Sequence, residues 1–218
     1  MSCVRVLPFA MTQVDDRHAC VGSLTEDGRW VRPEPVTLDM VDRAFVYRTW
    51  TELALVPSAH PDARPEDRAM LQAPRPLGRI DAAAWKELAE RHLDPDVLTA
   101  LGGERSLGLV KASIERLYLK RSTGGRRFVR MVFTDRASRT YDWIVPELRL
   151  RRLIERHAQG DRIDPRAEEH VRRALNDAEI YLCLGLTKPN HRLPGQFRGC
   201  HPLVVGLHAL PEPEELTS

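Results

Sequence analysis

Apolar and polar residues alternate with a period of two along much of the chain, which is the pattern of half-buried β-strands. The clearest early case is a hairpin over residues 18–32, whose turn contains the Asp27-Gly28 pair that is typical of tight hairpins. A three-stranded meander is expected later, with turns at residues 122–125 and 135–138. The expected strand segments are 3–9, 18–32, 43–57, 107–121, 126–134, 139–145, 180–187 and 202–210.

Helical spacing appears first in residues 81–100, where apolar residues recur on one face after Asp81, a residue type that often caps a helix N-terminus. Asp94-Pro95 is expected to open a second helical segment, which Gly102-Gly103 ends. The residues that share the apolar face are Trp85, Leu88, Ala89 and His92.

The segment 58–79 is proline-rich and polar, and we expect it to be a long loop or linker. Residues 147–178 are helical and charged, with a break near 160–165. The pattern predicts a mainly β (α+β) protein in which the strands on each side of the linker close a small antiparallel barrel, with connecting helices. The expected division is 1–80 for the first barrel with the linker and 81–218 for the helical connector with the second barrel. Terminal strands are allowed to cross between the two.

Composition changes this picture little. The chain has 218 residues, of which 42% are hydrophobic and 29% are charged, as in ordinary globular domains. The formal net charge is only +2, so a case for a polyanionic ligand has to rest on local clusters of cations. No stretch of the sequence approaches the ~18 apolar residues of a membrane helix. We therefore expect a cytoplasmic protein without membrane contact.

Cysteine and histidine do not form a recognisable ligand set. The four cysteines are widely spaced, unlike the close pairs of a disulfide framework or a zinc site. The nearest combinations are His18 with Cys20 and Cys200 with His201, and neither has the spacing of zinc ligands. We expect free thiols, no bound metal and no cofactor.

Cations gather in the expected meander, where residues 116–130 contain six basic residues and no acidic one. Alternation directs Leu117, Val129 and Met131 toward a core. Aromatic rings among cations suit the bases and phosphates of a single-stranded nucleic acid, although a solvated sheet face rich in long basic side chains gives the same pattern. The opposite face carries Arg116, Tyr118, Lys120, Arg126, Phe128 and Arg130.

The strand Trp30-Val31-Arg32-Pro33 raises a similar question. Trp30 and Arg32 share one face, and Val31, the natural core residue, lies on the other. Either Trp30 and Arg32 act at a second ligand face, or Trp30 is buried against the helix that follows the linker.

Catalytic signatures are missing from the sequence, which has no phosphate-binding loop, nucleophile elbow or metalloprotease motif. Asp135 and Asp142 flank a hairpin, and Cys200 and His201 are adjacent. These residues leave open an enzyme that acts on a nucleotide or small molecule in an inter-domain pocket. A subunit that binds another protein through an exposed edge strand is the other alternative.

Three motifs in order resemble the bacterial dual OB-containing domain family. CVGSLTEDGRWVRP resembles the opening of that family, and SLGLVKASIERL followed by FVRMVFTDRASRTYDWIV resembles its middle. YLCLGLTKP followed by GCHPLVVGLHAL resembles its closing strands. The resemblance covers most of the chain and implies two OB-like barrels. It implies no reaction, but OB folds often bind single-stranded nucleic acids on a sheet face.

These observations together favour a non-enzymatic module that binds single-stranded nucleic acid or a nucleotide. Arg116, Lys120, Arg126 and Arg130 are expected to contact phosphates, and Tyr118 and Phe128 to stack on bases. Trp30 and Arg32 are expected to act at a second face. The late loop is expected to close over the ligand through Lys188, Arg192 and Arg198.

Overall fold

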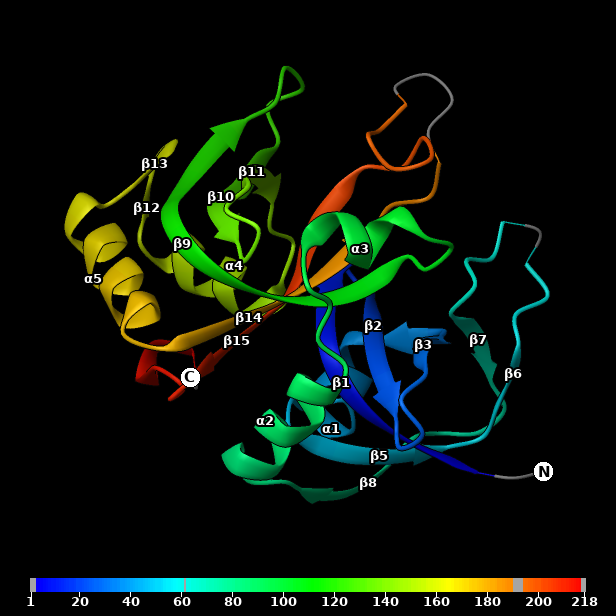
Figure 1. Ribbon diagram of the computed structural model, residues 1–218. Helices are drawn as coiled ribbons and strands as arrows, with labels where there is room; N and C mark the ends of the chain where they lie inside the picture. Colours follow the sequence, from blue (N-terminus) through cyan, green and yellow to red (C-terminus); the bar gives the residue numbers. More distant parts are fainter. Residues whose placement is uncertain (1–2, 61, 190–193, 217–218) are drawn as a thin grey trace.

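The computed structural model describes residues 3–60, 62–189 and 194–216. It is mainly β, with 47% strand and 22% helix, and it contains two curled β-units side by side (Figure 1). The expected fold class is therefore confirmed. Among the described residues, no helix is long and apolar enough to cross a membrane.

The first unit is a sheet that curls almost into a barrel. Its first three strands pair in sequence order and antiparallel, the third runs parallel to β7, and β7 pairs with β6. Since only Ala54 separates β5 from β6, and β5 pairs with β1, the ladder returns to its starting strand. The strands are β1 (Val4–Gln13), β2 (His18–Thr25), β3 (Trp30–Glu34), β4 (Val36–Thr37), β5 (Thr49–Leu53), β6 (Leu55–Pro57), β7 (Asp67–Met70) and β8 (Arg75–Arg79).

The second unit is a closed barrel with the order β10-β11-β15-β14-β9. Its third and last strands, β11 and β15, are parallel through Ile144 and Leu203. Both units therefore share one connectivity: strands in the order first, second, third, fifth, fourth, with a helix after the third. This is the five-stranded arrangement of OB folds. The strands are β9 (Leu107–Arg121), β10 (Arg127–Asp135), β11 (Thr140–Ile144), β14 (Glu179–Leu186) and β15 (Pro202–Leu210).

The helices mostly lie where the sequence predicts them. Asp81 accepts a hydrogen bond from the Ala84 amide and caps α2. The expectation for Asp94 is wrong, because Asp96 caps the next helix, while the Asp94 carboxylate accepts from the Leu109 amide and from Arg105. The helices are α1 (Leu38–Arg43), α2 (Ala82–Arg91), α3 (Val97–Gly102), α4 (Leu148–Arg156) and α5 (Pro165–Asn176), with the short hairpin β12 (Ala158–Gln159) and β13 (Arg162–Ile163) before α5.

The proline-rich segment 58–79 is not only a linker. It contributes β7, which is parallel to β3, and β8, which pairs with β5 at the edge of the first sheet. Pro76 lies inside β8, and proline is tolerated there because an edge strand needs only one side of its ladder. The low apolar content of the segment hides these strands from a periodicity analysis.

Two of the three predicted hairpin turns are confirmed by left-handed glycines. Gly28 and Gly125 each have φ of 80°, a conformation that glycine adopts without steric cost. Within β9, the register against β10 shifts at Glu115, so that Ile114 and Leu117 both face the core although three positions apart. This bulge sets the outward direction of the residues that follow it.

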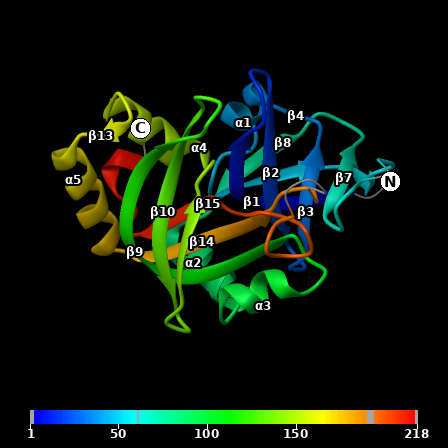
Figure 2. The ribbon, with the colours of Figure 1, turned by 90° about the horizontal axis from the view of Figure 1, so that it is seen from above.

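The two units meet through a buried apolar cluster. His208 of β15 is 2% exposed and its Nε2 lies 2.9 Å from the Phe9 carbonyl oxygen of β1. Gly206 lies so close to β1 that an added Cβ would be 1.9 Å from the Phe9 oxygen. Figure 2 shows β14 and β15 running between the rest of the second barrel and the first sheet. The buried members of the cluster are Leu7, Phe9, Ala10, Leu24, Trp30, Trp85, Leu88, Ala89, Leu107, Leu109, Tyr181, Cys183 and Val205.

Candidate nucleic-acid interface

The two long strands β9 and β10 carry the predicted surface. Tyr118 lies opposite Arg130, and Lys120 lies opposite Phe128. The predicted inward residues are buried, with Leu117 and Met131 at 0% exposure, so the assignment of faces by alternation is confirmed. We call the outward set the basic-aromatic face: Arg116, Tyr118, Lys120, Arg126, Phe128 and Arg130.

An arginine guanidinium group lies over each of the two aromatic rings of this face. The Arg116 guanidinium carbon lies 5.0 Å from the centroid of the Tyr118 ring, and that of Arg126 lies 5.3 Å from the centroid of Phe128. These are cation–π distances. A base that stacks on either ring would have to share the ring with the guanidinium or displace it.

Asp142 on β11 holds two of the predicted ligand residues. The Tyr118 hydroxyl donates to Asp142 Oδ2 at 2.6 Å, and Arg130 Nε donates to Asp142 Oδ1 at 2.9 Å. Burial opposes ionisation of Asp142, but these two hydrogen bonds lower its pKa below the ordinary value. Burial and the Asp142 hydrogen bond raise the pKa of Tyr118. The charge of Arg130 is therefore largely compensated inside the protein.

Among the described residues, three cations of the face have no salt-bridge partner. Within the described part of the chain, Arg116, Lys120 and Arg126 form no salt bridge, and all three side chains are exposed. Of the neighbouring cations, Arg121 pairs with Asp161 at 2.6 Å. Arg127 donates to the Gly160 carbonyl at 2.7 Å, and its charge helps to lower the pKa of Asp161. Exposed cations without a salt bridge thus lie at three positions around the two rings, and the charge of Lys120 also helps to lower the pKa of Asp142.

A cavity of about 620 Å³ opens beside the face, where the second barrel meets the first. Arg126, just before β10, and Phe128 of β10 line it on one side, and Ile144 lines it from β11. The β1–β2 turn of the first unit supplies Asp15 and Asp16 on the other side. Hydrogen bonds from the Arg17 amide and from His18 lower the pKa of Asp15 to about 2, so this wall of the cavity is anionic.

Trp30 and Arg32 do not form an exposed second face. Trp30 is 8% exposed and packs edge-on against Phe9 at 5.7 Å, in the cluster that contains Trp85 and Leu88 of α2. The alternative in which Trp30 is buried against that helix is correct. Val31 belongs to the core of the first unit, so the assignment of faces holds, but the second barrel covers the opposite face.

Arg32 is 4% exposed, and partners within the chain occupy its guanidinium. It pairs with Glu66 at 3.3 Å and donates to the Ser106 carbonyl at 2.9 Å and to the Ser106 hydroxyl. Burial lowers the pKa of Arg32 from its ordinary value. The sequence offered no signal for Glu66, which follows prolines in a segment without periodicity.

The late loop does not reach the face through any described contact. Lys188 is exposed just after β14. Arg198 has φ of 51° and donates to the Arg105 carbonyl at 2.7 Å, which places it beside the segment that leads into β9. Arg192 lies outside the described residues. Closure of this loop over a ligand stays a prediction.

The residues of the enzyme alternative do not converge. Asp135 caps its own turn and accepts from the Val97 amide and the Tyr141 hydroxyl, whereas Asp142 binds Tyr118 and Arg130. Cys200 is 8% exposed, with its sulfur 3.7 Å from the Arg198 carbonyl oxygen.

An inter-barrel cavity of about 250 Å³ does exist, but its lining does not include the carboxylates of the enzyme alternative. Cys20, Arg32 and Arg64 line it among apolar residues. The two guanidinium groups pair with Glu66 and Asp67 respectively.

All four cysteines are free thiols: Cys3 is exposed, Cys20 is half-buried, and the other two are buried. Burial raises the pKa of Cys183 far above its ordinary value, which keeps that thiol protonated. Among the described residues, no group of three or more histidine, cysteine or acidic residues is arranged to hold a metal ion.

The edge strand of the protein-partner alternative is β8. All five of its residues are exposed, and within the described chain it pairs only with β5. Leu77 on this strand is 38% exposed.

No family model matches the sequence, and no curated protein matches it.

Proposed function

We propose that the chain binds single-stranded nucleic acid or a nucleotide on the basic-aromatic face of the second barrel. The observation that carries the proposal is the group of exposed cations, Arg116, Lys120 and Arg126, which surrounds Tyr118 and Phe128 and forms no salt bridge within the described chain. OB barrels bind oligonucleotides on their second and third strands and the adjoining loops. In the second barrel these strands are β10 and β11, and the extension from fold to ligand is an analogy.

The geometry supports different roles for the residues of the basic-aromatic face, which the sequence assigned to a single ligand surface. Arg116, Lys120 and Arg126 are the phosphate contacts, because their charge is available to a ligand. Phe128 is the stacking residue, because it lines the 620 Å³ cavity in which a base has room. Arg130 and Tyr118 bind Asp142 and act as a brace between β9, β10 and β11 rather than as direct ligand contacts.

The test is fluorescence anisotropy of a labelled single-stranded 12-mer, titrated with protein at several salt concentrations. Changing Lys120 and Arg126 to alanine removes two phosphate contacts. The slope of log affinity against log salt should become shallower by roughly 0.7 per contact for a single strand. Arg172 and Arg173 on α5 both pair with Glu169, and the double alanine variant at these positions is the charge-matched control.

Two results would overturn the proposal. The wild-type protein would show no salt-dependent binding to any single strand at low ionic strength, or the α5 control would lose as much affinity as the variant at Lys120 and Arg126. The second result would mean that binding follows net charge and has no defined surface.

A further inference from the structure

A second cavity lies at the end of the first barrel, away from the basic-aromatic face. Helix α1 covers the end near the β1–β2 turn, where Val41 joins the barrel core. The opposite end, beside the β2–β3 hairpin, opens into a cavity of about 660 Å³, a size typical of small-molecule sites. This cavity shares no lining residue with the one beside Phe128.

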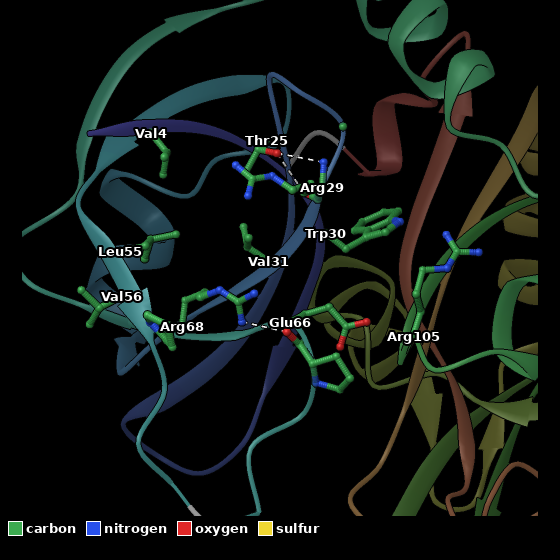
Figure 3. A pocket seen from close by; sticks show the side chains of 13 residues that line it. Val4, Thr25, Arg29, Trp30, Val31, Leu55, Val56, Glu66, Arg68 and Arg105 are labelled. Carbon is green, nitrogen blue, oxygen red and sulfur yellow. Dashed lines mark hydrogen bonds between the residues drawn. The ribbon is translucent and has the colours of Figure 1, made fainter. Parts of the chain in front are cut away.

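The floor of this cavity is the exposed end of the barrel core. Val4 of β1, Val31 of β3 and Leu55 of β6 belong to or pack against that core and line the cavity together with Val56 and Pro57. Figure 3 shows Val4, Val31 and Leu55 around one space, each on a different strand. An apolar body of a ligand would bury this surface, which gains free energy in proportion to the area removed from water.

The charged groups at the rim of the cavity differ in whether they have a counter-charge within the protein. Glu66 is 3% exposed and its carboxylate is already held by Arg32 and by the Ser106 amide and hydroxyl. Arg29 pairs with Asp27, and Arg105 pairs with Asp94. These groups therefore have their counter-charges inside the protein.

Arg68 has a different environment. Its guanidinium donates to the backbone carbonyls of Pro65 at 2.7 Å and Asp67 at 2.8 Å, and no carboxylate of the described residues forms a salt bridge with it. It lines the cavity next to Val31 (Figure 3). The two carbonyls fix the orientation of the guanidinium but leave its positive charge uncompensated, which prepares it for an anion.

We propose that this open barrel end binds a small organic carboxylate with a branched or aromatic body. The body packs on Val4, Val31 and Leu55, and the carboxylate accepts hydrogen bonds from Arg68. A polyphosphate fits poorly, because the floor is apolar and Glu66 also lines the cavity. The site is independent of the nucleic-acid proposal, since it lies on the other barrel.

The test uses 3-phenylpropionate and its uncharged analogue 3-phenylpropanamide as probes, with isothermal titration calorimetry on the full chain. We expect saturable binding of the acid at millimolar concentration and at least tenfold weaker binding of the amide. Changing Arg68 to glutamine should weaken the acid to the level of the amide, and Arg68→Lys should restore part of the loss. Arg75→Gln is the matched control, because Arg75 is an exposed arginine of the same sheet that already pairs with Glu52.

A second variant keeps the proposal testable if the Arg68 variants do not fold. Val56→Trp should fill the cavity from its rim and abolish binding of both probes while leaving the far-ultraviolet circular dichroism spectrum unchanged. Equal affinity for acid and amide, undiminished binding by folded Arg68→Gln, or no binding of either probe to the wild-type protein would overturn the proposal.

Discussion

In the proposed interface, Asp142 determines which residues of the basic-aromatic face are available to a ligand. Its carboxylate accepts from both Tyr118 and Arg130, so it lowers the positive charge that β10 presents to solvent. The exposed cations that form no salt bridge with this or another described carboxylate are Arg126, Arg116, which stacks on Tyr118, and Lys120, whose charge still helps to lower the pKa of Asp142.

Removing this carboxylate should therefore increase ligand binding. In Asp142→Asn, Arg130 loses its counter-ion and becomes a further phosphate contact. Oligonucleotide affinity should rise several-fold at low salt, and the salt slope should steepen by up to ~0.7. Anisotropy titrations measure both quantities. Glu169→Gln on α5 makes the same change in net charge next to Arg172 and Arg173, and an equal gain in that variant would contradict the assigned surface.

His208 is a buried neutral histidine between the barrels. It packs against Phe9, Tyr47 and Trp85. Burial, with Arg149 and Arg48 nearby, lowers its pKa from 6.5 to about 3. Between these values the unfolded chain binds a proton that the native chain does not, so stability falls as pH falls through this window.

The expected effect is a loss of up to about 1.4 kcal/mol per pH unit from this one group. His208→Gln keeps a side-chain N–H for the Phe9 carbonyl but does not titrate. Urea unfolding between pH 4 and 7 should show that the stability advantage of the wild-type protein shrinks toward acid pH. A constant difference across this range would show that His208 is not the titrating group.

At the scale of strands, the contact between β1 and β15 depends on Gly206. A Cβ at this position would lie 1.9 Å from the Phe9 carbonyl oxygen and 2.9 Å from Cys183 Cβ. The backbones of two barrels thus approach each other at a distance that only glycine allows.

Gly206→Ala should destabilise the protein by about 1–3 kcal/mol or more, because neither strand can move without disturbing its own ladder. Gly78→Ala in β8 is the control, since an added Cβ there has no neighbour within 4 Å. Chemical denaturation of both variants gives the comparison. A Gly206→Ala variant as stable as Gly78→Ala would contradict the close approach of the two strands.

Strand alternation correctly predicted the sheet face on which each side chain lies. It did not predict which part of the protein packs against that face. The outward direction of Arg116, Tyr118 and Phe128 follows from a period of two, and so does the separation of Val31 from Trp30. Alternation carries no information on packing between barrels, so the burial of Trp30 and Arg32 could not be read from it. The Asp142 brace was missed for the same reason, because register between β10 and β11 becomes known only when the strands are paired.

For the whole molecule, binding of a polyanion depends on where unpaired cations lie on the surface more than on the net charge. The net charge is only +2, and many cations are neutralised by neighbouring carboxylates, as Arg121 is by Asp161 and Arg149 by Glu147 and Glu212. The two barrels have the same strand connectivity but differ in which of their surfaces are covered. The first packs the outer side of β3 against the second, whereas the basic-aromatic face on β9 and β10 carries exposed cations, and we propose that a polyanion binds there.

The most direct measurement is a map of backbone amide chemical shifts in the full chain during titration with an unlabelled single-stranded 12-mer. The perturbed amides should cluster on β9 and β10 between residues 116 and 130 and on the neighbouring end of β11. The mouth of the first barrel around Arg68 should stay unchanged. Shifts confined to that mouth or to α5, or no shifts at low ionic strength, would contradict nucleic-acid binding on the second barrel.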